Sequence, residues 1–311
     1  TAQDLKDDFN EHLAEVTQQP NEIVLVGSGG DFTTINEALE FLSKRKTRYF
    51  SDGYTAEVKL KSGFVMEEQI SVQGIDLGWI TLTSEDSEVL INRSSLTQNR
   101  IYDTWFPAFE ARNGVLPIIG AMFNMNNNGE GENRHGIATT ENSRAIILPD
   151  CGVKNAGGNG LYAHVLSTAI ADSTIFSGAG GHGIYANQAS LINADFANAS
   201  NAGGNCLYAS LGSSMNARGA TATHAGNNGV SASQNSMINA QEVNASGANA
   251  HGIYAYTGGK VNAHSINARK GSSDSSNDIR IAFGAIISAI ESKGGTSINP
   301  NTITSSGIIF K

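Results

Sequence analysis

The stretch Gly160-Leu161-Tyr162-Ala163 decides the fold, because it returns at a constant spacing. It recurs as Gly183-Ile184-Tyr185-Ala186, Cys206-Leu207-Tyr208-Ala209, Gly229-Val230-Ser231-Ala232 and Gly252-Ile253-Tyr254-Ala255. Each step is 23 residues, so five units fill residues 160–274, and a degenerate copy begins 24 residues earlier at Gly136. A fixed period of this length is typical of a solenoid. We number positions within each unit from 1, starting at Gly160.

Apolar residues inside a unit alternate with polar ones. Positions 2, 10 and 15 are mostly aliphatic, positions 4 and 12 are always Ala, and position 17 is Phe176 followed by Ala. This period of two indicates strands. Three such runs per unit predict an all-β, right-handed parallel β-helix with three strands per rung, its hand following the usual crossover preference. A leucine-rich repeat would need several Leu and a helical segment per unit, and unit 183–205 has one Leu.

The composition excludes several classes of protein. The chain has 311 residues, a formal net charge of −9 and 16% charged residues, and this acidic balance argues against nucleic-acid binding. No apolar run approaches the ~20 residues of a membrane span, so we expect no membrane insertion. Two cysteines, Cys151 and Cys206, make no disulfide framework and fit small buried fillers.

The predicted organisation has four parts. Residues 1–20 form an amphipathic helix, with Leu5, Phe9, Leu13 and Val16 at helical spacing. Residues 21–136 form an irregular β-helix entry, and 137–296 form the regular coil. Residues 297–311 form a C-terminal strand tail that needs a partner, such as another chain. In the entry, a helix over Thr34–Arg45 is expected to close the end of the coil. The strands expected there are Ile23–Val26, Ala56–Leu60, Gln69–Val72, Ile80–Thr83, Val89–Ile91, Ala108–Ala111 and Ile118–Phe123.

Outward-facing positions also repeat from rung to rung. Asn occupies most of positions 11 and 16, which predicts side-chain ladders along the coil. Position 3 is Tyr162, Tyr185, Tyr208, Ser231 and Tyr254. A tyrosine column fits either a sugar-stacking platform or a packing face between chains.

One column carries candidate chemistry. Position 13 is Asp172, Asp195, Arg218, Gln241 and His264 in successive rungs. Rung spacing places the two aspartates about 5 Å apart at Cα, and retaining glycosidases hold two carboxyls at ~5–5.5 Å. The alternative is a solvated corner where any polar residue serves. The candidate catalytic residues are Asp172, Asp195 and Glu242, and the candidate substrate-binding residues are Arg218, Tyr162, Tyr185, Tyr208, Phe196 and His264.

Three histidines precede the glycine or residue that opens a rung. His182 and His251 share position 23 three units apart, about 14 Å by rung spacing, which is too far to share a metal. His135 stands at the equivalent place in the degenerate unit. We expect polar corner residues here, no metal site and no cofactor.

Two stretches resemble known families. Val26-Gly27-Ser28-Gly29-Gly30-Asp31-Phe32-Thr33-Thr34-Ile35-Asn36-Glu37-Ala38 resembles the entry segment of pectin methylesterases, and Lys59–Ser71 and Trp79–Asn92 resemble the strands that follow it there. The catalytic Gln and Asp motifs of that family have no counterpart, so the resemblance implies the pectin-lyase-like fold without the esterase reaction.

The whole arrangement looks more like a bacteriophage tailspike or tail fibre. The Gly-Asp-Phe-Thr-Thr-Ile-Asn entry at 30–36, Phe123–Asn126 and the array of rungs carry this likeness. It implies a homotrimer at the virion tail, outside the host cell, attached to other tail proteins through its N-terminal end. It also implies binding of a bacterial surface polysaccharide, capsule or lipopolysaccharide. No catalytic residue can be transferred, because the family shares no universal catalytic motif.

These observations leave three functions open. The first is a receptor-binding protein that also depolymerises the polysaccharide, as a glycosidase or a lyase. The second is an adhesin without enzyme activity. The third is a purely structural β-helical fibre. The absence of a strong catalytic cluster in the sequence favours binding over cleavage.

Overall fold

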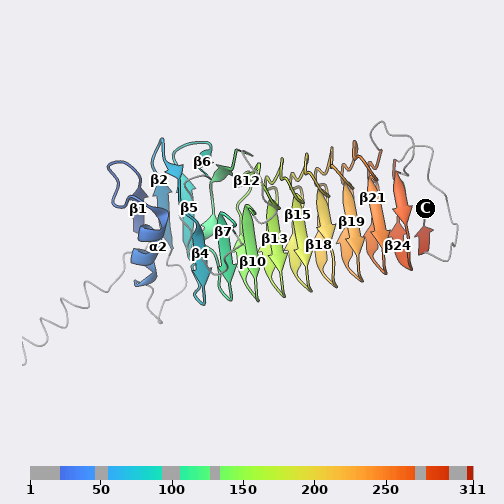
Figure 1. Cartoon of the computed structure of the whole chain (residues 1–311), viewed down its shortest axis with the longest axis horizontal. Coiled ribbons are helices and arrows are strands. Elements are labelled where there is room, and N and C mark those ends of the chain that lie inside the picture. Colours follow the sequence, from blue (N-terminus) through green and yellow to red (C-terminus); the bar gives the residue numbers. More distant parts are fainter. Residues whose placement is uncertain are drawn as a thin grey trace, which may run out of the picture.

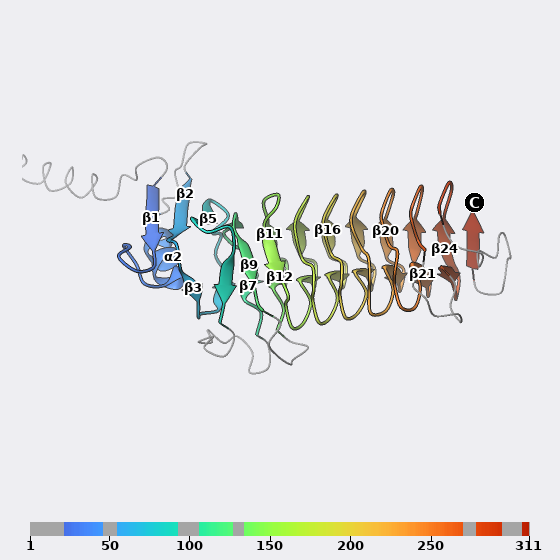
Figure 2. The same cartoon turned by 90° about the horizontal axis from the view of Figure 1, so that it is seen from above.

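The computed structural model is a right-handed parallel β-helix whose coils stack along one long axis (Figures 1 and 2). It describes residues 22–45, 55–92, 106–126, 134–269, 278–293 and 307–310. The predicted fold class is confirmed. The predicted helix over 1–20 lies outside the described residues.

Three faces run along the coil, each built of parallel strands. The first is a nine-stranded sheet of β4 (Ile70–Gln73), β7 (Phe109–Arg112), β10 (Ile137–Thr140), β13 (Leu161–His164), β15 (Ile184–Asn187), β17 (Leu207–Ala209), β19 (Val230–Ser233), β21 (Ile253–Tyr256) and β23 (Ile279–Ile281).

The second face starts with a four-stranded sheet and continues, through single paired residues, into an eight-stranded one. The four are β1 (Glu22–Val26), β2 (Ala56–Leu60), β5 (Ile80–Ser84) and β8 (Ile118–Ile119). The eight are β11 (Arg144–Ile146), β14 (Thr168–Ile170), β16 (Leu191–Asn193), β18 (Ser214–Asn216), β20 (Met237–Asn239), β22 (Lys260–Asn262), β24 (Ala285–Ser288) and β25 (Gly307–Phe310).

The third face differs from the prediction in the regular coils. Near the N-terminus it has four short strands, β3 (Val65–Met66), β6 (Val89–Ile91), β9 (Met122–Asn124) and β12 (Gly152–Lys154). Beyond Gly152 it shrinks to one paired residue per coil, at Ile175, Asn198, Thr221, Asn244, Asn267 and Lys293. Tight turns on both sides leave no room for a longer strand, so the third predicted strand of each unit is a single bridge.

Two other boundaries also need correction. The strand expected over Ile118–Phe123 is split into β8 and β9, because the chain turns the corner between the second and third faces at Gly120. The C-terminal strand β25 pairs in parallel with β24 of the same chain, Ile286 opposite Ile308. The tail therefore extends the second face, and its partner is the chain's own last coil.

The 23-residue register is kept without a slip. Leu161 pairs with Ile184, Ile184 with Leu207, and Leu207 with Val230. Every residue is therefore stacked on the residue 23 places away, which builds the columns expected from the sequence. The apolar positions of these columns point inward and are fully buried.

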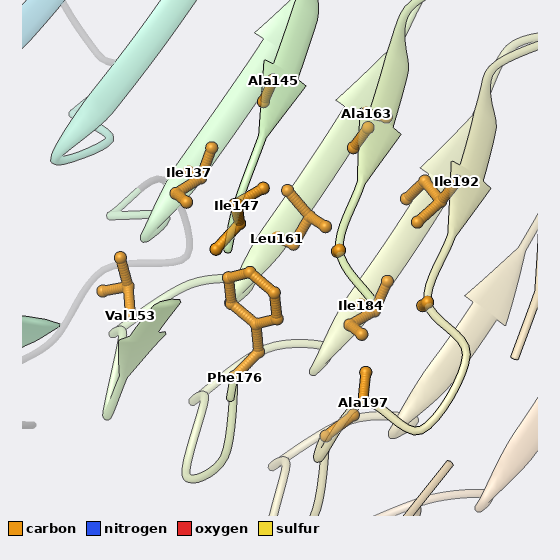
Figure 3. Close-up of a cluster of buried hydrophobic side chains, with 14 of the residues drawn as sticks. Ile137, Ala145, Ile147, Val153, Leu161, Ala163, Phe176, Ile184, Ile192 and Ala197 are labelled. Atoms are coloured by element: carbon orange, nitrogen blue, oxygen red, sulfur yellow. The ribbon is translucent and has the colours of Figure 1, made fainter. Parts of the chain in front are cut away.

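The core is narrow because most inward positions are Ala. Larger side chains meet where the regular coils begin: Figure 3 shows Phe176 among Ile147, Val153, Leu161 and Ile184, all buried. Phe176 occupies position 17, where the following coils have Ala, such as Ala199. One large ring at this level therefore fills the transition from the irregular entry to the regular coil.

A helix covers the N-terminal end of the coil, as predicted (Figure 2). It is α2 (Ile35–Ser43), capped by Thr34, whose side chain accepts the N–H of Glu37 while the Glu37 carboxylate accepts the N–H of Thr34. Its apolar side packs against β1 and β2. The carboxylate of Glu68 accepts the N–H groups of Ile35 and Asn36 at the helix start. No helix in the described part of the chain is long and apolar enough to cross a membrane.

A serine column joins the coils at the corner between the first and second faces. The hydroxyl oxygens of Ser167, Ser190, Ser213 and Ser236 each accept the backbone N–H of the serine one coil earlier, at 3.1 Å. All of them are buried. These N–H groups point along the coil axis at a turn, where the sheet ladder is interrupted, so the hydroxyls satisfy donors that would otherwise be unpaired.

The predicted asparagine ladders are confirmed in part. Asn239 donates to Asn216 at 3.2 Å and Asn262 donates to Asn239 at 3.1 Å, both at position 11. At position 16, Asn267 donates to Asn244 at 3.1 Å. Asn193 departs from the pattern, because its amide donates to the carboxylate of Asp172.

We predict that Ser190→Ala lowers the free energy of unfolding by about 1–3 kcal/mol, because the buried N–H of Ser167 loses its acceptor. Urea denaturation followed by circular dichroism measures the change. Ser214→Ala is the control, since Ser214 lies on the outer side of β18. Equal stability of the two variants would contradict a stabilising role for the serine column.

Candidate functional site

The predicted acidic site lies at the corner between the second and third faces. Asp172, Asp195, Arg218, Gln241 and His264 follow one another in successive coils at position 13, as the register requires. Phe196 and Glu242 occupy position 14 beside them. We call this corner the ridge and define it by positions 13 and 14 of these coils.

Both aspartates of the ridge accept backbone hydrogen bonds. Oδ1 of Asp172 accepts the N–H of Asp195 at 3.1 Å, and Oδ1 of Asp195 accepts the N–H of Arg218 at 2.8 Å. The second oxygen of Asp172 accepts from Asn193 at 2.9 Å. These carboxylates therefore accept backbone N–H groups of the neighbouring coil at this corner, as the hydroxyls of the serine column do at theirs. The pair is brought together as predicted, but both oxygens of Asp172 are already engaged.

Charged groups next to the aspartates form exposed pairs. Arg218 lies 3.3 Å from Glu242, and both side chains are half exposed. Nε2 of His264 lies 3.1 Å from Glu291, and this hydrogen bond lowers the pKa of the Glu291 carboxyl. Pairs this exposed contribute little to stability, so their charges remain available to a ligand.

Phe196 is an exposed aromatic ring in an unfavourable backbone position. Its φ is +60°, the left-handed value shared by Ser173, Glu242 and Ser265 at position 14, and its side chain is 57% exposed. The ring reaches over Gly219 of the next coil, where a Cβ would lie 2.6 Å from the ring carbons. A bulky residue at positive φ is rare and costs free energy; in this chain Leu166 and Phe283 are also exposed at positive φ, at a different corner of the coil.

The tyrosine column lies on the first face, away from the ridge. The rings of Tyr162 and Tyr185 stack with centroids 5.0 Å apart, and those of Tyr185 and Tyr208 at 4.7 Å. Their hydroxyls bond to the next coil, for example that of Tyr185 to Ser210. Burial raises the pKa of Tyr162 to about 12. The ring faces are turned toward one another, so a sugar meets ring edges rather than a stacking platform.

The tyrosines and the acid pair lie on different faces of the coil. Tyr185 is on the nine-stranded first face, whereas Asp195 follows β16 on the second face. The register aligned each column correctly, but a whole corner of the coil separates position 3 from position 13. The six ridge residues lie along one corner, and the three tyrosines belong to another surface.

Histidine and asparagine alternate along a third corner, at position 23. Nδ1 of His135 accepts the N–H of Asn159 at 2.8 Å, Oδ1 of Asn159 accepts the N–H of His182 at 2.8 Å, and Nδ1 of His182 accepts the N–H of Asn205 at 2.9 Å. Burial lowers the pKa of His135 to about 3 and that of His182 to about 4. Both imidazoles are neutral at pH 7, with the proton on Nε2, because Nδ1 is the acceptor.

Sequence reasoning did not single out the buried carboxyl of Glu110. Glu110 is 1% exposed, and burial raises its pKa to about 7. Its Oε2 lies 3.5 Å from the hydroxyl of Ser71, and among the described residues Oε1 has no hydrogen-bond partner. Both amide atoms of the buried Gln69 are in the same state. The strand pattern placed Glu110 on the outer side of the first face, and nothing in the sequence indicated its burial.

Neither a metal site nor a reactive thiol is found in the part of the chain that the structure describes. No three His, Cys, Asp or Glu side chains gather there. Cys206 is buried, and burial raises the pKa of its thiol to about 12, which makes it an inert filler.

We predict that His182→Asn reduces the acid sensitivity of the fold. The pKa of His182 falls from 6.5 to about 4 on folding, so the unfolded chain binds more protons and stability is lost as the pH falls from 6.5 toward 4. This difference corresponds to roughly 3 kcal/mol. Asn keeps the backbone acceptor, as Asn159 does one coil earlier. Urea denaturation at pH 7 and pH 4 should show a smaller loss in the variant; an equal loss in both proteins would refute the assignment.

No model of a known protein family matches the chain, and no curated protein sequence matches it. Among solved structures, the A-module of the mannuronan C-5 epimerase AlgE4 from Azotobacter vinelandii is similar, with 11% identity and a TM-score of 0.44 over 78% of this chain and 81% of that one. The pectin methylesterase from Aspergillus niger in deglycosylated form has 14% identity and a TM-score of 0.36, over 95% and 82%. At this level the likeness concerns the path of the chain, and no reaction is assigned by it.

Proposed function

We propose that this protein is a virion tail adhesin that binds a bacterial surface polysaccharide along the ridge. The observation that carries the proposal is Phe196, an exposed ring held at positive φ over a glycine. An aromatic ring placed at a cost to the backbone and left in solvent is explained by a ligand that covers it. Sugar rings present C–H groups that pack on such a face.

Neighbouring groups on the ridge supply polar contacts for the same ligand. Arg218 and Glu242 stand on either side of Gly219, half exposed and weakly paired. His264 and Glu291 continue the row two coils further on. A row of shallow contacts at one corner of a long coil suits an extended polymer, which would make the same kind of contact in several coils.

The arrangement favours binding over cleavage. A catalytic acid or nucleophile needs a carboxyl oxygen that is free to meet the substrate. Asp172 has both oxygens occupied, and Asp195 uses one to hold the backbone of Arg218. If either carboxylate turned to a substrate, the backbone N–H of Asp195 or Arg218 would lose its acceptor. The depolymerase remains an alternative that the assay below distinguishes.

We also propose that the chain acts as a homotrimer, attached to other tail proteins through its N-terminal end. Support comes from the outer side of the second face, where position 9 carries exposed Leu191, Met237 and Ile286. Leu191 and Met237 lie two coils apart, with Ser214 between them, and Lys260 separates Met237 from Ile286. Exposed apolar side chains in one column are a surface suited to self-association.

We predict that Phe196→Ser lowers the affinity for the bacterial polysaccharide at least tenfold, because the ring is lost. Serine is the native residue at the same position and φ in Ser173 and Ser265, so the fold should be as stable as before or more so. Binding is measured with purified capsule and lipopolysaccharide from candidate bacteria. Phe283→Ser is the matched control, since Phe283 is 72% exposed at φ +50° but lies at another corner.

The same incubations separate the adhesin from the depolymerase. Oligosaccharide release that disappears in Asp195→Asn would replace the adhesin with an enzyme. Unchanged binding by Phe196→Ser, or an equal loss in Phe283→Ser, would remove the ridge as the binding site.

We predict that light scattering finds a trimer of this 32.6 kDa chain, and that Leu191→Ser with Met237→Ser weakens it toward monomer. Ser214 already occupies position 9 between them, so the substitution suits the strand. A wild-type monomer or dimer would contradict the assembly.

A further inference from the structure

A hollow runs along the corner between the third and first faces, away from the ridge. It has a volume of about 490 Å³. Its floor is made of glycines at positions 21 and 22, and its wall of His135, His182, Asn159, Tyr162 and Tyr185. We call it the glycine groove. It spans the coils of β13 and β15, near the middle of the molecule in Figure 1.

The floor of the glycine groove is bare backbone because successive coils approach closely there. A Cβ on Gly180 would lie 2.4 Å from the carbonyl oxygen of Gly157, and one on Gly203 would lie 2.2 Å from that of Gly180. These contacts account for glycine at position 21 in the coils of the groove, whereas two coils further on Asn249 occupies the same position.

Position 22 is different, and it is what opens the groove. A Cβ on Gly204 would lie 2.7 Å from Nδ1 of His182, and one on Gly181 would lie 2.7 Å from Oδ1 of Asn159, so glycine at position 22 gives room to the side chain at position 23 of the coil before. One coil further on, the fold closes the same corner with Asn205 and Asn227, at the same two positions. The coil can therefore be built without the pair His182 and Gly204. Because Gly204 has no side chain, it leaves open the space that the side chain of Asn227 occupies one coil further on.

The wall of the groove is aromatic and uncharged. The ring of His182 packs against Tyr185 at 5.0 Å and Tyr208 at 4.9 Å, and that of His135 packs against Tyr162 at 5.2 Å. The lining residues include no Asp, Glu, Lys or Arg. Neutral imidazole, amide and ring edges offer hydrogen bonds and apolar contact, but no group that would select an ion.

We propose that the glycine groove binds an uncharged, hydroxyl-rich chain, a segment of neutral oligosaccharide running along the coil axis. The stacked rings of the wall present their edges to one side of it. The bare glycine floor lets the ligand approach the backbone. The site is separate from the ridge and does not depend on binding there.

The test is the double variant His182→Asn with Gly204→Asn, which copies the arrangement of Asn205 and Asn227 and fills the groove. Calorimetry with neutral hexasaccharides of glucose, mannose and N-acetylglucosamine should show binding of at least one to the wild type. The double variant should bind it at least tenfold more weakly. Phe196→Ser should bind it as the wild type does, which separates this site from the ridge.

Nuclear magnetic resonance of the wild type gives a second readout that needs no variant. The bound hexasaccharide should shift the signals of the His182 ring and leave those of His264, on the ridge, in place. The proposal fails if none of the three neutral probes binds, if the double variant binds equally well, or if an oligogalacturonate binds more tightly than all of them.

Discussion

The structure depends on backbone N–H groups at the corners of the coil being accepted by side chains of the neighbouring coil. A parallel β-helix pairs its backbone along each face, and at the corners some N–H groups bond to backbone carbonyls of a neighbouring coil whereas others need a side-chain acceptor. Ser190 at one corner, Asp172 at the second and His182 at the third all meet this need. Each accepts an N–H from the same position one coil away. The register is what brings acceptor and donor together, and these contacts survive one extra residue: in the 24-residue coil before Gly160, Ser167 still accepts the N–H of Ser143 and His135 that of Asn159.

This constraint changes how polar columns in the chain are interpreted. Repeated Ser, Asp, Asn or His at one position is first of all a set of corner acceptors. The aspartate pair matches the carboxyl spacing of a glycosidase because coils are stacked at the rise of a sheet, and any pair of acids in one column would do the same. Function is better sought where a column is interrupted by a residue that the corner does not need. Phe196 among small or polar neighbours and Gly204 opposite His182 are two such places.

Both places leave the ladder intact while altering the surface. At the ridge, the glycine of the next coil gives room to an exposed ring, and at the groove, a glycine gives room to a histidine. In each case a large side chain in one coil lies against a glycine in the next coil. The two features lie at different corners, so a long ligand at one and a second segment at the other would not compete. The rigid coil fixes the spacing within each site in advance, which lowers the entropy lost on binding.

The sequence by itself determined the coil, its period, the inward and outward positions, the capping helix and the columns, because in a stacked solenoid a sequence period becomes a spatial spacing directly. Ala56–Leu60 and Val89–Ile91, in the irregular entry, were also predicted to the residue. Only the tertiary structure decided where side chains point at corners. The turn dihedrals direct Asp172 toward the next backbone N–H, stack the tyrosine rings on one another and reduce the third face to single bridges. The burial of Glu110 and the pairing of β25 with β24 depend on contacts in irregular coils, where no constant period exists to carry the prediction.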